Sequence, residues 1–240
     1  MAEHISRKEL KQDKIHDAIE HGAEAVFSHT TLIAAAILVA AIVAVSYAGW
    51  RFYTDRKTVQ ASAALDVAMK AYSARVGTTP DPSDPGETLY PTEQARSADA
   101  AQKFSAVAEK YPSTNPGRLA RYYAALCYED LDRQNQALEE LKKISSGKDK
   151  ELVAMAQYQM GVIYERTGKP AEAAKILRNL ADHSSVFVPR PVALLELAEV
   201  LRQTDPKAAA SVYEQLKKEF PNTAVSDEAD RGLETLAPKS

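Results

Sequence analysis

The strongest constraint on the fold is a small motif that recurs at a nearly constant spacing along the chain. It consists of a small residue followed four positions later by a large one, so both lie on one face of a helix. The four copies are Ala100 with Phe104, Ala137 with Leu141, Ala173 with Leu177, and Ala209 with Tyr213. The last three copies are 36 residues apart, and the first precedes them by 37. A period of this length is typical of stacked structural repeats.

A second helix is predicted before each of the last three copies, because these segments carry their own recurring pair. A small residue is followed three positions later by a large one: Ala125 and Tyr128, Gly161 and Tyr164, Ala198 and Leu201. Small residues let two helices approach closely where they cross, and large neighbours fill the space beside the crossing. Each unit is therefore predicted to be a helical hairpin, and the fold class to be all α.

Residues that begin or end helices agree with this period. Gly168 can end one helix in a left-handed conformation, and Pro170 can occupy the first turn of the next helix. Asp205 before Pro206 predicts an N-cap in the following unit, and Asn135 predicts one in the unit before.

The region before the repeats is predicted to contain two further helices and a loop. One helix runs from about Arg56 to Ala74, either as a separate helix or as a continuation of the apolar segment before it. Another starts after an N-cap at Thr92 and ends near Lys110. The segment between them, residues 77–92, contains four prolines. Proline lacks the backbone N–H that a helix needs, so this segment is predicted to be a Pro-rich loop.

Residues 30–50 form an apolar run without a charged side chain. As a helix this run would be about 31 Å long, which matches a bilayer core of about 30 Å. Aromatic residues that favour the membrane interface stand at its far end, namely Tyr47, Trp50, Phe52 and Tyr53. We interpret residues 30–50 as a transmembrane helix that separates an N-terminal polar tail, residues 1–29, from a repeat domain, residues 51–240.

Two other interpretations of the run stay open from the sequence. A cleaved signal usually has a shorter apolar stretch after a basic segment, whereas residues 1–29 hold six acids and four bases. Ser46-Tyr47-Ala48 nevertheless resembles a cleavage site. A buried core helix is the other alternative, because the run is rich in alanine. Within the tail, Ser6 to Glu9 matches a capping box and predicts a weakly amphipathic helix.

Composition and motifs argue against catalysis and nucleic-acid binding. A net charge of −3 lacks the basic footprint of a nucleic-acid-binding domain. The histidines form no i,i+4 pair for a metal, and the glycines form no phosphate loop. Cys127 lies in a helical stretch and is predicted to be a buried thiol. We therefore predict no enzyme activity, metal, cofactor or small-molecule substrate, and we interpret Glu139-Glu140 and Glu196 with Glu199 as solvated faces.

The hairpins resemble the tetratricopeptide repeat. Gly161, Tyr164, Ala173 and Leu177 stand at the positions of that family's pattern, although Gln157 replaces its usual Trp. The last copy fits with Ala198, Ala209, Tyr213 and Pro221 after a one-residue deletion. The resemblance implies a helical-repeat superhelix that acts in protein–protein interaction.

The order of parts is similar to YfgM-type bacterial inner-membrane proteins, which carry one span ending in a segment like "AGWRFYTDRK" followed by degenerate repeats. This resemblance implies a periplasmic repeat domain that works beside the SecYEG translocon and a PpiD-like chaperone. A scaffold for another envelope complex, in cell division or outer-membrane assembly, is the alternative with the same fold.

The distribution of basic residues around the span does not determine on which side of the membrane the repeats lie. Arg51, Arg56 and Lys57 directly follow the span, whereas the bases of the tail lie further from it. Basic residues near a span favour the cytoplasm, which would place the repeats inside. The resemblance implies the opposite, a cytoplasmic tail and periplasmic repeats, and we adopt that orientation as the expectation.

First helices of stacked hairpins line the concave face of such a superhelix. In the tetratricopeptide register, twelve residues would form this partner-binding face: Leu119, Tyr122, Leu126, Glu129, Met155, Tyr158, Val162, Glu165, Val192, Leu195, Glu199 and Arg202. The basic clamp that similar repeats use for a peptide carboxylate is absent, so an extended or helical protein segment is the expected partner. The alternative that much of this stripe is core stays open.

Overall fold

The computed structural model describes residues 30–79 and 88–237. The chain divides into two units, residues 1–56 and residues 57–240, which we treat separately. One helix, α2 (Thr30–Tyr72), contributes to both units. The helix predicted to start near Arg56 is thus the C-terminal part of a longer helix. The predicted helix in the tail lies outside the described residues.

The N-terminal part of α2 is apolar and exposed. Its most apolar window of 18 residues has a mean hydropathy of 2.4, and none of that window is buried. Leu32, Leu38 and Trp50 are more than half exposed. The interpretation as a buried core helix is therefore wrong, and α2 is long and apolar enough to cross a membrane.

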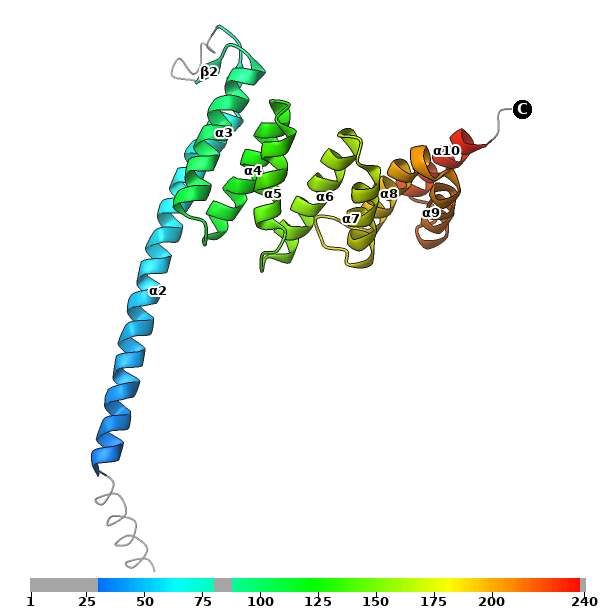
Figure 1. The fold of residues 1–240 in the computed structure, drawn as a ribbon. Coiled ribbons are helices and arrows are strands. Elements are labelled where there is room, and N and C mark those ends of the chain that lie inside the picture. Colours follow the sequence, from blue (N-terminus) through cyan, green and yellow to red (C-terminus); the bar gives the residue numbers. More distant parts are fainter. Residues whose placement is uncertain (1–29, 80–87, 238–240) are drawn as a thin grey trace, which may run out of the picture. The chain divides into compact units, whose positions relative to one another are not determined.

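The second unit is built from helices that pack in sequence order (Figure 1). After α2 they are α3 (Glu93–Lys110), α4 (Asn115–Asp130), α5 (Gln134–Ile144), α6 (Lys150–Arg166), α7 (Pro170–Asp182), α8 (Arg190–Thr204), α9 (Pro206–Glu219) and α10 (Ala224–Leu236). The hairpins α4–α5, α6–α7 and α8–α9 confirm the prediction from the period. Helix α10 packs against α9 and α8 and follows the last hairpin.

Two very short strands flank the Pro-rich loop and are the only departure from an all-α fold among the described residues. Strand β1 (Arg75–Val76) pairs in parallel with β2 (Leu89–Tyr90). Residues 80–87 between them lie outside the described part. The pairing places the end of α2 next to the start of α3.

The recurring pairs form the core, as the period predicts. All eight residues of the four copies are at most 1% exposed: Ala100, Phe104, Ala137, Leu141, Ala173, Leu177, Ala209 and Tyr213. Gly161 marks a close helix crossing, because a Cβ there would lie 3.3 Å from the side chain of Leu177. Small residues thus set the distance between the two helices of a hairpin.

Most of the predicted helix ends are confirmed. Gly168 has a φ of +74°, Pro170 begins α7, and the Asp205 carboxylate accepts a hydrogen bond from the Ala208 N–H at 3.0 Å. Thr92 caps α3 through the Ala95 N–H at 3.1 Å.

The N-cap predicted at Asn135 is wrong. Helix α5 begins one residue earlier, at Gln134, and no described side chain caps it. Asp132 has a φ of +60°, and the Arg133 N–H donates to the carbonyl of Tyr128 at 2.8 Å. This turn brings the chain back into helical geometry before Asn135 is reached.

The first core cluster joins the C-terminal part of α2 to α3 and α4. It contains Ala61, Ala68 and Ala71 of α2. The rings of Phe104 and Tyr123 stack with centroids 5.3 Å apart. Cys127 lies in the same cluster with no exposed surface, and burial raises its pKa to about 12. The prediction of a buried thiol is confirmed.

We predict that Gly232→Ala destabilises the C-terminal end of the repeat domain. Gly232 of α10 lies against the buried ring of Tyr213, and an added Cβ would collide with three ring carbons. Overpacking of this kind lowers the free energy of unfolding by about 1–3 kcal/mol. Urea denaturation monitored by circular dichroism measures the change. Glu234→Ala, at an exposed position of the same helix, should leave the midpoint almost unchanged, and an equal loss in both variants would contradict the packing argument.

Candidate functional site: the first-helix face

The first helices of the three hairpins, α4, α6 and α8, carry the twelve residues predicted to bind a partner, and we call this surface the first-helix face. Side chains link the three helices in series. Arg166 of α6 donates to Glu129 of α4 at 2.6 Å, and Tyr158 of α6 donates to Glu196 of α8 at 2.8 Å. The three helices that carry the predicted residues are therefore neighbours in the structure, with α6 in contact with both α4 and α8.

The twelve residues are divided between core and surface. All are half-buried except Val192, which is 37% exposed. Leu119 and Tyr122 pack against the core cluster of α4, α5 and α6, whereas Tyr158 and Leu195 pack against the cluster of the last hairpins. Each of these side chains stabilises the fold with one side and leaves another side accessible.

A row of acidic side chains runs along the same face. Glu129 accepts hydrogen bonds from Gln159 and Arg166. Glu199 accepts one from the Tyr213 hydroxyl at 2.5 Å and pairs with Arg202 at 3.0 Å. We call Glu129, Glu165, Glu196 and Glu199 the acidic row.

The interpretation of Glu196 and Glu199 as a solvated face is wrong, because both are half-buried. They lie on the side of α8 that meets tyrosine hydroxyls of neighbouring helices, and a buried hydroxyl needs an acceptor. Glu140 is also half-buried, and it pairs with Arg121 at 2.5 Å and with Lys143 at 2.7 Å. Glu139 is exposed, as predicted.

The acidic row concentrates negative charge where water is partly excluded. Burial raises the pKa of Glu165, and the nearby charges of Glu196 and Glu199 raise it further, while Arg202 opposes the shift. Burial also raises the pKa of Glu129, although Gln159 and Arg166 favour its charged form. Such a surface attracts a segment with positive charge.

The tyrosines of the face remain protonated hydrogen-bond donors. Burial raises the pKa of Tyr122 to about 12. Burial and the hydrogen bond to Glu196 raise the pKa of Tyr158 still further. The face thus offers aromatic and aliphatic surface, tyrosine hydroxyls and carboxylates, which suit the recognition of a protein segment.

Three residues that join the helices of the face were missed by sequence reasoning: Gln159, Arg166 and Glu196. The period pairs Glu129 with Glu165, whereas the actual partner of Glu129 is Arg166, one residue later. The signal in the sequence is a pair of opposite charges separated by one residue more than the period, as Glu129 and Arg166 are. Gln159 and Glu196 have no periodic counterpart of the same kind.

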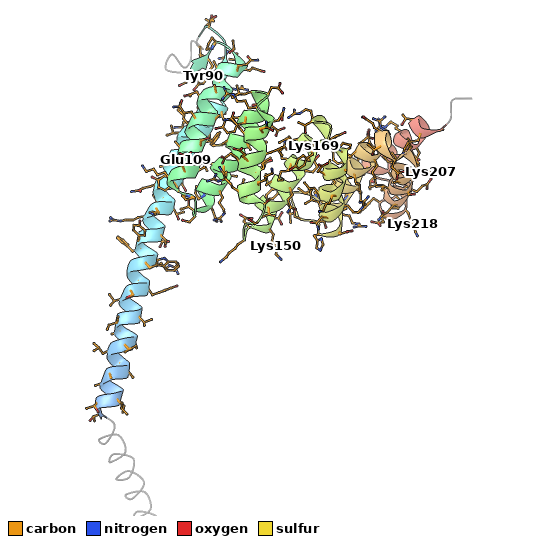
Figure 2. The ribbon with its side chains drawn as sticks, in the orientation of Figure 1. Tyr90, Glu109, Lys150, Lys169, Lys207 and Lys218 are labelled. Carbon is orange, nitrogen blue, oxygen red and sulfur yellow. The ribbon has the colours of Figure 1, made fainter. Side chains whose placement is uncertain are left out.

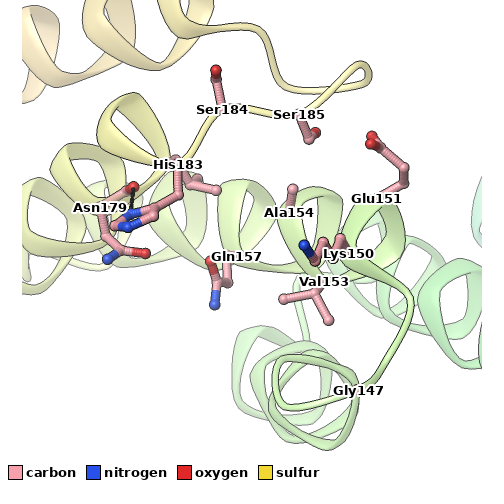
Figure 3. A pocket seen from close by; sticks show the side chains of 11 residues that line it. Gly147, Lys150, Glu151, Val153, Ala154, Gln157, Asn179, His183, Ser184 and Ser185 are labelled. Carbon is pink, nitrogen blue, oxygen red and sulfur yellow. Dashed lines mark hydrogen bonds between the residues drawn. The ribbon is translucent and has the colours of Figure 1, made fainter.

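A separate cavity of about 390 Å³ lies away from the acidic row, beside α6 and α7 (Figure 3). Its polar lining includes Lys150, Gln157, Asn179, His183 and Ser184. The His183 ring contacts the Asn179 carbonyl, with Nδ1 and the oxygen 3.2 Å apart. None of the twelve predicted residues lines it.

Within residues 30–79 and 88–237, no group of three His, Cys, Asp or Glu side chains is arranged for a metal ion.

Comparison with known families agrees with this architecture. A family model described as a tetratricopeptide repeat-like domain matches residues 28–190, which is more than half of the chain. The chain belongs to the tetratricopeptide repeat-like domain family. A second model, of the tetratricopeptide repeat itself, matches residues 192–223, so the tetratricopeptide repeats extend through the hairpin α8–α9. Comparison with curated proteins and with solved structures gives no match.

We predict that Glu165→Gln stabilises this tetratricopeptide repeat domain at neutral pH. A carboxyl group whose pKa is raised on folding destabilises the native state when it is ionised, and this penalty disappears below the unfolded-state pKa. The variant should therefore have a higher urea midpoint at pH 7, and the gain should shrink as the pH falls from neutral towards about 4.5 and be lost below that pH. Equilibrium unfolding at several pH values tests this.

The control for this prediction is Glu172→Gln, at an exposed position of α7. It should change the midpoint little at any pH. A destabilised Glu165→Gln protein at pH 7 would contradict the idea that the acidic row carries an electrostatic cost.

Proposed function

We propose that the protein is a membrane-anchored module for protein–protein interaction, without catalytic activity. Tetratricopeptide repeats indicate such a module, and α2 is long and apolar enough to supply the anchor. The observation that carries the proposal is the first-helix face, where half-buried tyrosine and aliphatic side chains adjoin the acidic row across three hairpins.

The preferred partner is an amphipathic or extended protein segment with basic residues. Tyr122, Met155, Tyr158 and Leu195 offer partly exposed apolar surface for its anchoring side chains. The acidic row supplies charge complementary to the basic residues of the partner. Such complementarity increases the specificity and the rate of association more than it increases the affinity.

We further propose that the repeat domain lies in the periplasm at the bacterial inner membrane, beside the SecYEG translocon and a PpiD-like chaperone. The order of parts supports this, because a short tail, one span and degenerate repeats resemble YfgM-type proteins. In this role the first-helix face would hold segments of emerging envelope proteins.

The orientation can be tested with a reporter fused to Ser240. We expect a reporter that is active only in the periplasm to be active, and one that is active only in the cytoplasm to be silent. Fusions to a variant in which Arg51, Arg56 and Lys57 are replaced by Gln should strengthen this result, because these bases favour retention inside. Activity of the cytoplasmic reporter would contradict the orientation.

The alternative is a scaffold for one envelope complex, in cell division or outer-membrane assembly. Crosslinking in native membranes followed by mass spectrometry separates the two. Translocon subunits and several unrelated emerging chains are expected for the proposed function. Repeated recovery of one fixed set of proteins would favour the scaffold instead.

We predict that the double variant Tyr122→Ala/Tyr158→Ala weakens partner capture more than it weakens folding. Both rings combine core contacts with accessible surface, so their removal should cost about 2–4 kcal/mol in stability and should also remove binding anchors. Ile176→Ala is the matched control, since Ile176 packs against the same two clusters but lies on α7.

Pull-down and urea denaturation are measured on the same preparations. We expect the Ile176 variant to lose stability and retain its partners, and the tyrosine variant to lose its partners at temperatures where it remains folded. Equal capture by both folded variants would contradict a binding role for the first-helix face.

A further inference from the structure

One edge of the repeat domain carries exposed lysines next to an exposed apolar loop. The loop between α7 and α8 presents Val186, which is 80% exposed, and Phe187, which is 66% exposed. The connection between α5 and α6 contributes Lys148, and the adjoining helix ends contribute Lys142 and Lys150, all exposed. We call these five residues the lysine–phenylalanine patch.

The loop is held so that the apolar side chains point outward. Val188 is only 3% exposed and anchors the loop in the core. The Ser185 N–H donates to the Val188 carbonyl at 3.1 Å, and the Val188 N–H donates to the Ser185 hydroxyl at 3.0 Å. The Phe187 N–H donates to the Glu151 carboxylate of α6 at 3.1 Å. This last bond ties the apolar loop to the helix that follows the lysine-bearing connection.

The three lysines of the patch outnumber the carboxylates beside them. The Asp149 carboxylate caps α6 by accepting from the Leu152 N–H at 3.2 Å, and the Glu151 carboxylate accepts from the Phe187 N–H. Both carboxylates keep their negative charge, so three lysines and two carboxylates leave a net charge of +1. Lys142, Lys148 and Lys150 make no ion pair within residues 30–79 and 88–237. The cavity of Figure 3 opens beside them, and its Lys150, Gln157 and Ser184 side chains can donate hydrogen bonds to an anionic group.

Topology places this patch on the edge at which the chain enters the repeat domain. The pairing of β1 with β2 brings the end of α2 to the start of α3, so Lys57 lies at the same edge as Lys110, where α3 ends. The connections α3–α4, α5–α6 and α7–α8 follow along this edge (Figure 1). In Figure 2, Lys150 and Lys218 lie along this edge, whereas Lys169 and Lys207 lie along the opposite one.

We propose that the lysine–phenylalanine patch binds the anionic phospholipid surface of the bilayer that α2 crosses. This inference rests on the membrane anchoring in the proposed function. Lysines attract anionic headgroups over about a Debye length, and an aromatic side chain is favoured at the headgroup level. A lipid surface matches the combination of three exposed lysines and two adjacent apolar side chains. Docking there would restrain the repeat domain and leave the first-helix face for proteins.

The test uses the full chain reconstituted in lipid nanodiscs. A Val186→Cys variant in a Cys127→Ala background carries an environment-sensitive fluorophore, and brominated lipids quench it on contact. With part of the phosphatidylcholine replaced by phosphatidylglycerol, we expect quenching to rise at least about twofold and to fall again at high salt. The triple variant Lys142→Gln/Lys148→Gln/Lys150→Gln and the single variant Phe187→Ser should each reduce the quenching in anionic discs.

A label at Gln203→Cys, an exposed position on the opposite edge, is the matched control and should remain unquenched in both lipids. Equal quenching of the Val186 label in neutral and anionic discs, or no effect of the lysine variant, would overturn the proposal. A label that stays unquenched in anionic discs but crosslinks to a protein in native membranes would also overturn it and make the patch a protein-docking site.

These outcomes are separable from failure of the proposed function. Incorporation of the chain into nanodiscs reports on the anchor, and pull-down from the same samples reports on the first-helix face. The lysine variant should retain its protein partners, because none of its three lysines lies on α4 or α8 or among the predicted contact residues of α6.

Discussion

The rest of the structure depends on the close crossing of two helices at a small residue within each hairpin. At Gly161 the backbone of α6 lies so near Leu177 of α7 that even one methyl group would be in tight contact. Ala125 and Ala198 are fully buried at the equivalent sites. A hairpin built in this way cannot cover its own apolar surface, so each unit is stabilised by its neighbours. The final apolar face, at Tyr213, is covered by α10 through Gly232.

This packing also determines the character of the first-helix face. Because the first helices touch one another through long side chains, tyrosine hydroxyls are partly withdrawn from water and need acceptors. Glu196 and Glu199 serve Tyr158 and Tyr213 in this way. The carboxylates then accumulate along one line, and the pKa of Glu165 rises because of burial and because of its acidic neighbours. The negative charge that Glu196 and Glu199 bring to the first-helix face therefore follows from the need of the tyrosine hydroxyls for acceptors.

The period predicted the helical hairpins, their core pairs and most helix ends, because those features depend on residue size and local backbone preference. Gly168, Pro170 and Asp205 act as expected. Asn135 did not, since a left-handed residue at Asp132 started α5 early. Arg166 and Glu196 act through contacts between hairpins. These contacts cannot be predicted from the repeat, because neither residue has an equivalent at the same position of the next unit. The Phe187 loop was missed for the same reason, as only its anchoring by Glu151 shows that it is held outward.

We propose that the partners of this tetratricopeptide repeat protein bind the first-helix face. Photo-crosslinking amino acids placed at Val192 of α8 and at Ser211 of α9 test it most directly, because both positions are exposed and belong to the same hairpin. In native membranes we expect protein crosslinks from position 192 and none above background from position 211. Crosslinks from position 211 alone would contradict the claim and place the binding surface on the second helices.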